Sequence, residues 1–178
     1  MTKKFTKDFT KDYYKGLSGV YFFKILNTII KMGNLRDRNV KILDFGCGVG
    51  HLKKLLPGKV INYDLNPELT EIDDWKNATF DAVVANQVLI YLSKDELMKL
   101  LDELYKHNPK LEMYVGISTQ GIINKILRIF ANQRDSYADV KLSPKDEISA
   151  LKQKMDVIKK KNVFFMCDVY SLRFKKPN

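Results

Sequence analysis

Residues 40–50 read Val-Lys-Ile-Leu-Asp-Phe-Gly-Cys-Gly-Val-Gly, an apolar run that ends in an acid and is followed by three glycines at alternate positions. A helical pattern begins directly afterwards at residues 51–56, so the pattern predicts a strand, a tight turn and a helix. Glycine suits such a turn because it tolerates positive φ and, lacking a Cβ, lets a ligand lie directly on the main chain. The helix that follows adds unpaired backbone N–H groups. We therefore predict a ligand-binding turn at residues 44–50.

Three other glycine motifs share parts of this turn, but each requires residues that are missing here. The dinucleotide-binding fingerprint places its third glycine where this chain has His51. A phosphate-binding loop ends in Gly-Lys-Ser/Thr, whereas Gly50 is followed by His51 and Leu52. An Asp-Phe-Gly motif of the protein-kinase type would need a catalytic-loop motif, which the sequence lacks. An ordinary glycine turn without a ligand stays open as the alternative.

The turn resembles the acid-x-Gly-x-Gly-x-Gly signature of class I S-adenosylmethionine-dependent methyltransferases, and the resemblance covers residues 40–117 well and the rest loosely. It implies the Rossmann-like α/β fold, a doubly wound, mostly parallel sheet of seven strands in the order 3-2-1-4-5-7-6 with the last strand antiparallel. It also implies S-adenosylmethionine as the cofactor. From the turn, the resemblance assigns to cofactor binding Asp44, Phe45, Gly46, Cys47, Gly48 and Gly50.

A second acid, Asp64, lies at the end of the next predicted strand. This strand is Val-Ile-Asn-Tyr-Asp at residues 60–64, and its acid follows Asp44 by twenty residues. A carboxylate at the end of the second strand can accept hydrogen bonds from both ribose hydroxyls of a nucleotide. We therefore expect Asp64, with the adjacent Leu65, to bind the adenosyl group.

The connection after the second strand is short, because only seventeen positions separate its acid from Asp81, at the start of the next strand expected from the resemblance. A full helix and strand do not fit in this interval. We therefore predict a trimmed crossover between strands 2 and 4 of the family order, with a minimal strand near residues 71–74. The resemblance places there an acid that contacts the adenine amino group. The candidates are Asp73 and Asp74, with Trp75 packed beside the ring, and two surface carboxylates are the alternative.

Residues 80–86 resemble the fourth strand of the family, and the segment after this strand faces the reaction centre in family members. The resemblance assigns Asn86 and Gln87 to the cofactor and makes Gln87 and Tyr91 candidate catalytic residues. The pair Ile90-Tyr91 stands where many small-molecule members carry Glu-His, so a ready imidazole base is missing. No proline follows the strand, which disfavours amino-group methylation of DNA or glutamine.

The N-terminal segment, residues 1–34, contains a predicted helix over residues 9–33, with apolar residues every three or four positions and Gly33 as its end. Many small-molecule members of the resembling family fold a tyrosine-bearing N-terminal helix over the cofactor. We therefore expect residues 1–34 to form a helical lid with Tyr13-Tyr14 at its start. Core packing of this aromatic pair is the alternative.

The chain continues with a helix and a buried strand inside what we predict to be a single domain, residues 1–178. Ser93 and Glu96 form a capping box that opens a helix to about residue 107. Residues 111–117 are almost continuously apolar, as a buried parallel strand should be, and predict the fifth strand of the family order. Residues 40–117 are therefore the expected cofactor-binding core.

Two segments complete the predicted domain. Residues 118–142 fall where the family varies its substrate cover, and they contribute Arg134 and Tyr137 as further candidate catalytic residues. Residues 143–178 predict a closing helix and a hairpin of two strands, residues 157–165 and 167–174. A longer helix followed by one strand is the alternative.

Length and composition indicate one cytoplasmic domain. The chain has 178 residues with 45% hydrophobic content, which is enough for one substantial core. The lysine-interrupted N-terminus lacks the apolar region of a signal peptide, and no run approaches the roughly 20 apolar residues of a membrane span. Two cysteines, one of them in the glycine turn, do not form a disulfide framework or a metal cluster, so we predict reduced thiols and no metal.

The net charge of +10 is concentrated at the two ends of the chain. Residues 1–34 carry seven Lys against two Asp, and residues 140–178 carry ten basic against four acidic residues. This pattern suits a solvated surface or an anionic partner such as RNA. Lys supplies 26 of the 31 basic residues, whereas shaped recognition of phosphate favours Arg, so we rank nucleic acid below a small molecule as the partner.

We therefore expect a methyltransferase that moves a methyl group from S-adenosylmethionine to an O, N or C atom of a small molecule. An RNA methyltransferase and a non-catalytic S-adenosylmethionine-binding module are the alternatives. A sulfonium already makes its methyl group reactive, so the main tasks of such a protein are alignment of the acceptor and exclusion of water. The sequence leaves open the acceptor, the use of a general base and the oligomeric state.

Overall fold

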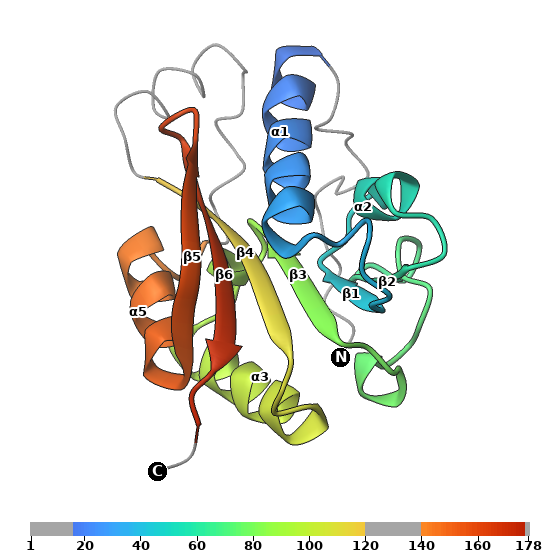
Figure 1. The fold of residues 1–178 in the computed structure, drawn as a ribbon. Coiled ribbons are helices and arrows are strands. Elements are labelled where there is room, and N and C mark those ends of the chain that lie inside the picture. Colours follow the sequence, from blue (N-terminus) through green and yellow to red (C-terminus); the bar gives the residue numbers. More distant parts are fainter. Residues whose placement is uncertain (1–15, 120–139, 177–178) are drawn as a thin grey trace.

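A computed structural model describes residues 16–119 and 140–176 and shows one mixed sheet with helices on both faces (Figure 1). The strands are β1 Ile42–Phe45, β2 Val60–Tyr63, β3 Ala82–Asn86, β4 Glu112–Ser118, β5 Met155–Val163 and β6 Cys167–Phe174. The α-helices are α1 Gly16–Gly33, α2 His51–Leu55, α3 Lys94–His107 and α5 Pro144–Lys154, and the 3-10 helices are η1 Trp75–Asn77 and η2 Leu89–Tyr91. No helix in the two described ranges is long and apolar enough to cross a bilayer.

The sheet has the strand order β2-β1-β3-β4-β6-β5. Its first four strands are parallel, and β6 runs antiparallel to both β4 and β5. In this register Leu43 of β1 pairs with Ile61 on one side and with Val83 on the other. The predicted antiparallel last strand is therefore confirmed. The carboxyl ends of the parallel strands meet at one edge, which is the edge where doubly wound folds bind ligands.

The sheet differs from the prediction because it has six strands, not seven, within the described residues. The minimal strand expected near residues 71–74 is wrong, since this part of the described chain forms bends. Glu71 N still donates to Asn62 O at 3.0 Å, but the chain then turns into η1, where Asp74 is the N-cap. The interval between β2 and β3 is too short for a helix, a strand and their turns. The remaining order matches the predicted one with its third strand removed.

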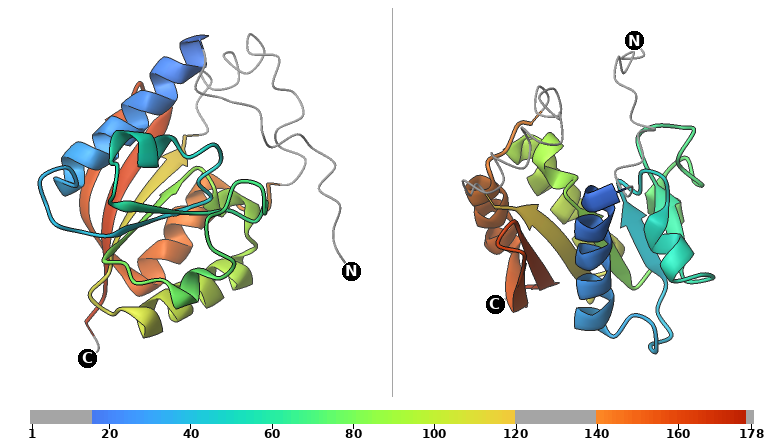
Figure 2. Two further views of the ribbon diagram at one scale, coloured as in Figure 1. Left: turned by 90° about the vertical axis from the view of Figure 1, so that its right-hand side faces the viewer. Right: turned by 90° about the horizontal axis from the view of Figure 1, so that it is seen from above.

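Two hydrophobic cores lie on the two faces of the sheet. Helices α1 and α2 cover one face, and α3 and α5 cover the other (Figure 1, Figure 2). Successive strand residues point to opposite faces, so Ile42 and Tyr114 belong to the core under α1, whereas Leu43 and Met113 belong to the core under α3. Because both faces are covered, the central strands carry nearly unbroken apolar runs.

The helix ends follow their capping residues. Ser93 accepts from Glu96 N and the Glu96 side chain accepts from Ser93 N, so the predicted capping box opens α3. The buried face of α3 carries Leu97, Leu100, Leu101 and Leu104. Helix α1 ends at Gly33, as predicted, where Asn34 turns the chain with a φ of 49°. Position 33 requires glycine because a Cβ atom there would lie 2.5 Å from the Tyr114 hydroxyl. The predicted start of this helix, with Tyr13-Tyr14, lies outside the described residues.

The closing hairpin has two strands, as predicted, but its first strand is displaced. Strand β5 begins at Met155, directly after α5, and ends at Val163, two residues earlier at both ends than expected. Strand β6 has the predicted bounds. Buried Met155 and Val163 flank seven exposed residues, because β5 is the last strand of the sheet and pairs with β6 alone within the described residues.

Candidate functional site

The glycine turn joins β1 to α2 at the carboxyl edge of the sheet. All three glycines have left-handed backbone, with φ of 75° at Gly46, 52° at Gly48 and 71° at Gly50. The backbone N–H groups of Gly46 and Cys47 both donate to the carbonyl oxygen of Tyr63, at 2.8 and 3.2 Å, so the turn is tied to the end of β2. Other residues rarely adopt this conformation, which explains glycine at all three positions.

The three glycines differ in what surrounds them. A Cβ atom on Gly46 would lie 2.3 Å from Cγ2 of Val88, and one on Gly50 would lie 2.8 Å from Nδ2 of Asn62. These two glycines are required by the packing of the protein itself. A Cβ atom on Gly48 would meet no atom of the described chain within 4 Å. Gly48 therefore presents its main chain to open space, where a ligand can reach it.

Asp64 lies directly against this open position. Its Oδ2 accepts from Gly48 N and its Oδ1 accepts from Asn66 N, each at 3.0 Å. Each carboxylate oxygen has capacity for a second hydrogen bond, so two fixed oxygens remain able to accept from a diol. The next residue, Leu65, is 68% exposed and offers an apolar surface beside this carboxylate.

Asp44 is the last but one residue of β1, directly before the strand-to-turn junction, and is 5% exposed. Burial and the nearby charge of Asp64 raise the pKa of Asp44 to about 7. Two neighbouring carboxylates repel each other and are stabilised by a cation between them. The arrangement therefore favours a ligand that carries both a diol and positive charge.

The other two predicted turn residues pack against the protein. The ring of Phe45 lies 5.4 Å from the ring of Tyr63, measured between centroids. The Cys47 sulfur lies 3.4 Å from the carbonyl oxygens of Gly48 and Leu69. Burial raises the pKa of the Cys47 thiol, so the thiol stays protonated and serves the shape of the turn.

Asn86 and Gln87 follow at the carboxyl end of β3, one strand away from the turn. The buried Oδ1 of Asn86 has no hydrogen-bond partner within the described residues. Gln87 has a φ of 56°, and its backbone N donates to the Gly116 carbonyl oxygen at 2.9 Å. This oxygen packs against β4, because a Cβ atom on Gly116 would lie 2.3 Å from it, so the protein itself encloses it.

Tyr21 of α1 joins this edge although the sequence pattern did not reveal it. The Gln87 amide Nε2 donates to the Tyr21 hydroxyl at 2.9 Å, which links α1 to the end of β3. Burial, together with the nearby Cys167, raises the pKa of Tyr21, so its phenol stays protonated. The available signal was spacing, because Tyr21 lies seven residues after Tyr14 and therefore on the same face of the predicted helix.

An open pocket of about 300 Å³ lies beside the shortened crossover. It is lined by Glu71, Ile72, Asp73, Asp74, Asn77 and Ala78. Asp74 already accepts from Lys76 N at 3.0 Å as the cap of η1, whereas the exposed Asp73 faces solvent. Burial and the charges of Asp74 and Asp64 raise the pKa of Tyr63, which shows that the pocket and the turn lie close together.

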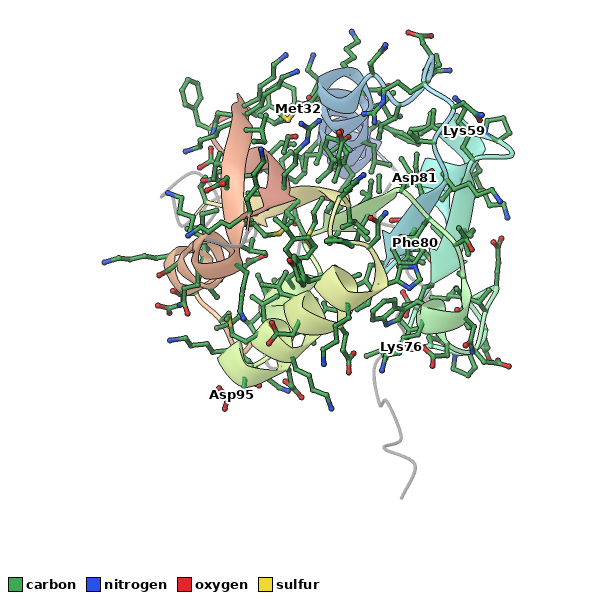
Figure 3. All side chains as sticks on the ribbon, turned by 60° about the horizontal axis from the view of Figure 1, so that its bottom comes forward. Met32, Lys59, Lys76, Phe80, Asp81 and Asp95 are labelled. Atoms are coloured by element: carbon green, nitrogen blue, oxygen red, sulfur yellow. The ribbon has the colours of Figure 1, made fainter. Side chains whose placement is uncertain are left out.

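Trp75 belongs to the core, and its expected place beside a bound ring is wrong. It is 4% exposed, and its ring centroid lies 6.1 Å from those of both Phe80 and His107. Phe80 stacks on His107 at 4.5 Å, and Figure 3 shows Phe80 beside η1 and α3. The short crossover brings no helix to cover this part of the sheet, so Trp75 fills the space.

The structure describes only some of the residues that were predicted to contact the methyl acceptor. Tyr91 ends η2 and is 36% exposed. Arg134 and Tyr137 lie outside the described residues. The chain has two histidines, and both pack against rings, His107 on Phe80 and His51 edge-on against Phe23 at 5.2 Å. No group of three or more potential metal ligands occurs within residues 16–119 and 140–176.

Comparisons with known proteins match the architecture and not the sequence. No protein-family model and no curated protein matches this sequence. The solved structure of the PH0226 protein from Pyrococcus horikoshii OT3 matches with a TM-score of 0.64 and 14% identity, over 91% of this chain and 93% of that chain.

Two further solved structures carry a function in their names. N-methyltransferase NodS from Bradyrhizobium japonicum WM9, in complex with S-adenosyl-L-homocysteine, matches with a TM-score of 0.60 and 14% identity, over 88% of each chain. Magnesium protoporphyrin IX methyltransferase (ChlM) from Synechocystis PCC 6803, with bound SAH, matches with a TM-score of 0.59 and 14% identity, over 85% of this chain and 81% of that chain. Likeness at this level of identity concerns the fold, and it extends over most of the chain. The protein therefore has the fold of the class I S-adenosylmethionine-dependent methyltransferases.

Proposed function

We propose that this protein is an S-adenosylmethionine-dependent methyltransferase that acts on a small molecule. The observation that carries the proposal is the open main chain of Gly48, with the Asp64 carboxylate 3.0 Å from its N–H group. A nucleoside lying on this glycine would meet two fixed acceptor oxygens at the position of its ribose hydroxyls. The fold supports the proposal, because NodS and ChlM have it and bind S-adenosylhomocysteine.

The polar groups of the site match the chemistry of S-adenosylmethionine. Asp64 would accept from the ribose, and the buried Asp44 would favour the positive charge of the amino acid part. Leu65 offers an apolar surface to adenine, and Asp73 or Asp74 would accept from the adenine amino group in the adjacent pocket. The residues proposed to shape the rest of the cofactor site are Phe45, Gly46, Cys47, Gly50, Asn86 and Gln87.

The chain would contribute positioning to the reaction more than proton transfer. When bound, the sulfonium supplies an activated methyl group, so the protein must align the acceptor with it and exclude water. His107 stacks on Phe80 and His51 lies edge-on against Phe23, so we assign neither histidine as a general base. We assign acceptor contacts to Gln87 and Tyr91, and to Arg134 and Tyr137 in the segment proposed as substrate cover, residues 118–142.

A small-molecule acceptor is favoured over RNA by two observations. ChlM, which shares the fold, is named for methylation of magnesium protoporphyrin IX, a small molecule. The basic residues of this chain are mainly Lys, whereas recognition of RNA phosphates favours Arg. The proposed cover, residues 118–142, would enclose a small acceptor. Of the proposed lid, residues 1–34, the structure describes α1, which packs on the sheet as part of the core.

Calorimetry with S-adenosylmethionine and S-adenosylhomocysteine tests the proposal. We expect binding of both, and we expect Asp64→Ala to weaken it by about 1.5–3 kcal/mol, the range for hydrogen bonds to a charged group. The matched control is Asp95→Ala, because Asp95 is an exposed acid on α3, far from the glycine turn (Figure 3). Equal affinity in the wild type and in Asp64→Ala would refute the assigned site.

Turnover separates an enzyme from a binding module. A methyltransferase should convert S-adenosylmethionine to S-adenosylhomocysteine when a pool of small metabolites is supplied. Binding without turnover in any such pool would favour the non-catalytic module. Turnover that requires added RNA and falls steeply with salt would favour the RNA enzyme instead.

A further inference from the structure

The turn between β5 and β6 places two phenylalanines in a conformation that suits glycine or asparagine. Met166 N donates to Val163 O at 3.0 Å, so Phe164 and Phe165 are the two central residues of a tight hairpin turn. Their φ values are 53° and 57°. Two-residue hairpin turns with positive φ at both positions prefer Asn-Gly, because bulky residues are disfavoured there. A feature that is unfavourable for folding indicates a role outside folding.

The same two side chains are among the most exposed large apolar groups of the described chain. Phe165 is 81% exposed and Phe164 is 51% exposed. Their backbone is nevertheless well anchored, because Phe165 N donates to Asn162 Oδ1 at 2.6 Å and the Thr119 hydroxyl donates to Phe165 O at 2.7 Å. Asn162 is itself held by Asp168 at 2.8 Å. The rings are therefore presented to solvent by an ordered turn.

Three basic residues of β5 precede the turn in the sequence. Lys159, Lys160 and Lys161 are consecutive and exposed on this outermost strand. The ammonium of Lys160 is neutralised by Asp168 at 2.8 Å. The ammonium of Lys159 donates to the Met32 carbonyl oxygen of α1 at 3.4 Å and keeps its charge, so Lys159 and Lys161 provide the excess charge. Ile158, before them, is 48% exposed. The hairpin thus combines an exposed apolar turn with a positively charged strand, β5.

We propose that the hairpin tip, residues 163–166, docks on an anionic membrane surface. Phe164 and Phe165 would enter the region between headgroups and acyl chains, and Lys159 and Lys161 would meet acidic headgroups. Apolar side chains beside basic ones are the pattern by which peripheral proteins bind such surfaces. This interaction does not depend on binding of a cofactor.

Two other partners fit the hairpin less well. Single-stranded nucleic acid stacks on aromatic rings that line a positively charged groove. Phe164 and Phe165 instead belong to the turn at the narrow end of the β5–β6 hairpin (Figure 1). Protein interfaces are depleted in Lys, which here forms the run behind the rings. A soft surface with diffuse negative charge matches a projecting tip and flexible ammonium groups.

Docking through this tip would turn the candidate site toward the membrane. The tip is bonded to the residue after β4, because Thr119 N donates to Met166 O at 2.8 Å. It therefore stands at the carboxyl edge of the sheet, the same edge that carries Gly48 and Asp64. The candidate site and the membrane contact would face the same way.

Sedimentation of the full chain with vesicles of phosphatidylcholine, with and without phosphatidylserine, tests this proposal. We expect binding to the anionic vesicles that weakens with salt. The double change Phe164→Asn, Phe165→Gly should weaken binding by about tenfold or more, while the melting temperature stays equal or rises because Asn-Gly suits the turn. A purely structural role of the rings would lower the melting temperature instead.

Charge variants provide the matched comparison. Lys159→Glu with Lys161→Glu should weaken binding by about tenfold or more, whereas Lys94→Glu with Lys99→Glu, a pair of exposed lysines on α3, should leave it close to wild type. The single change Phe165→Gly provides a second test if the double variant folds poorly. Unchanged binding in the phenylalanine variants, equal loss in both lysine pairs, or preference for single-stranded RNA over vesicles would each overturn the proposal.

Discussion

At Gly48 the main chain of the turn faces open space, whereas Gly46 and Gly50 are enclosed by Val88 and Asn62. Three glycines that look equivalent in the motif therefore have different tasks. Gly46 and Gly50 let the turn pack, and Gly48 leaves room for a ligand. A substitution at Gly48 should therefore affect mainly ligand binding, whereas one at Gly46 or Gly50 should affect mainly the stability of the fold.

We expect Gly48→Val to abolish S-adenosylmethionine binding and to lower the free energy of unfolding by about 1–2 kcal/mol, because valine at a left-handed φ is strained. Gly46→Val should lower the free energy of unfolding by more, since its side chain would also collide with Val88. Calorimetry measures binding and urea denaturation measures stability. Wild-type affinity in Gly48→Val would show that the cofactor does not approach this glycine.

We expect Asp44 to make cofactor affinity dependent on pH. Its pKa in the free protein is raised to about 7, by burial and by the charge of Asp64. A bound cation favours the carboxylate, so below pH 7 binding must first remove a proton. Affinity should therefore fall by up to about tenfold per unit as pH drops below 7, and level off above pH 8.

Titration calorimetry between pH 5 and pH 8, on both sides of the Asp44 pKa of about 7, measures this dependence. Asp44→Asn should bind more weakly and show a flatter profile, because the amide does not titrate. If affinity depends on pH no more in the wild type than in Asp44→Asn, then Asp44 does not release a proton when the cofactor binds.

Among the elements, β4 is held at its amino end by an ion cluster around the buried Glu112, at the edge of the sheet opposite the candidate site. Glu112 accepts from Arg38 at 2.6 Å, from Arg173 at 2.5 Å and from the Tyr114 hydroxyl at 2.7 Å. These partners come from the α1–β1 connection, from β6 and from β4 itself. Burial opposes ionisation of Glu112, but hydrogen bonds from Arg38, Tyr114 and Arg173 outweigh it and lower its pKa to about 2.

We expect Glu112→Gln to lower the free energy of unfolding by about 1–2 kcal/mol near neutral pH, because hydrogen bonds to a charged acceptor are lost while the two partly exposed arginines are solvated instead. The folded pKa lies below the unfolded one, so this stabilisation is present above pH 4.5 and is lost as pH falls toward 2. The control is Asp102→Asn, which removes the exposed Lys154–Asp102 pair between α5 and α3 and should cost less than about 1 kcal/mol. Equal effects of the two changes would contradict the role of the cluster.

At the scale of the whole molecule, acids with opposite pKa shifts set the pH dependence of stability. Glu147 on α5 is fully buried, and neither of its carboxylate oxygens has a hydrogen-bond partner within the described residues. Burial raises the pKa of Glu147 to about 8. The folded state therefore holds a proton that the unfolded state releases above pH 4.5, so stability falls as pH rises from 4.5 to 8. Glu112 has the opposite effect below pH 4.5.

We expect Glu147→Gln to match the wild type near pH 5 and to be more stable at pH 8, by on the order of a few kcal/mol, because the amide never has to bury a charge. Urea denaturation across this pH range measures the difference. Equal stability of both proteins at every pH would mean that the Glu147 carboxylate is ionised and solvated in the folded protein.

Local patterns in the sequence determined the glycine turn and most of the elements. Three left-handed positions demand glycine wherever the turn lies, and the capping box of Ser93 and Glu96 opens α3 without tertiary help. The spacing of Asp44 and Asp64 predicted two acids at neighbouring strand ends, and the structure places Asp64 against Gly48. Alternating strands and helices sufficed for the parallel order of the first four strands.

Only the tertiary structure decided what depends on neighbours far away in the sequence. The expected strand at residues 71–74 did not form because too short a chain must return to β3, and Trp75 fills the uncovered space. The link between Tyr21 and Gln87 joins residues 66 positions apart. Periodicity shows that a helix has an apolar face, but it does not show what that face meets. Burial of Glu147 and exposure of Phe165 arise from packing between elements, and no local pattern contains that information.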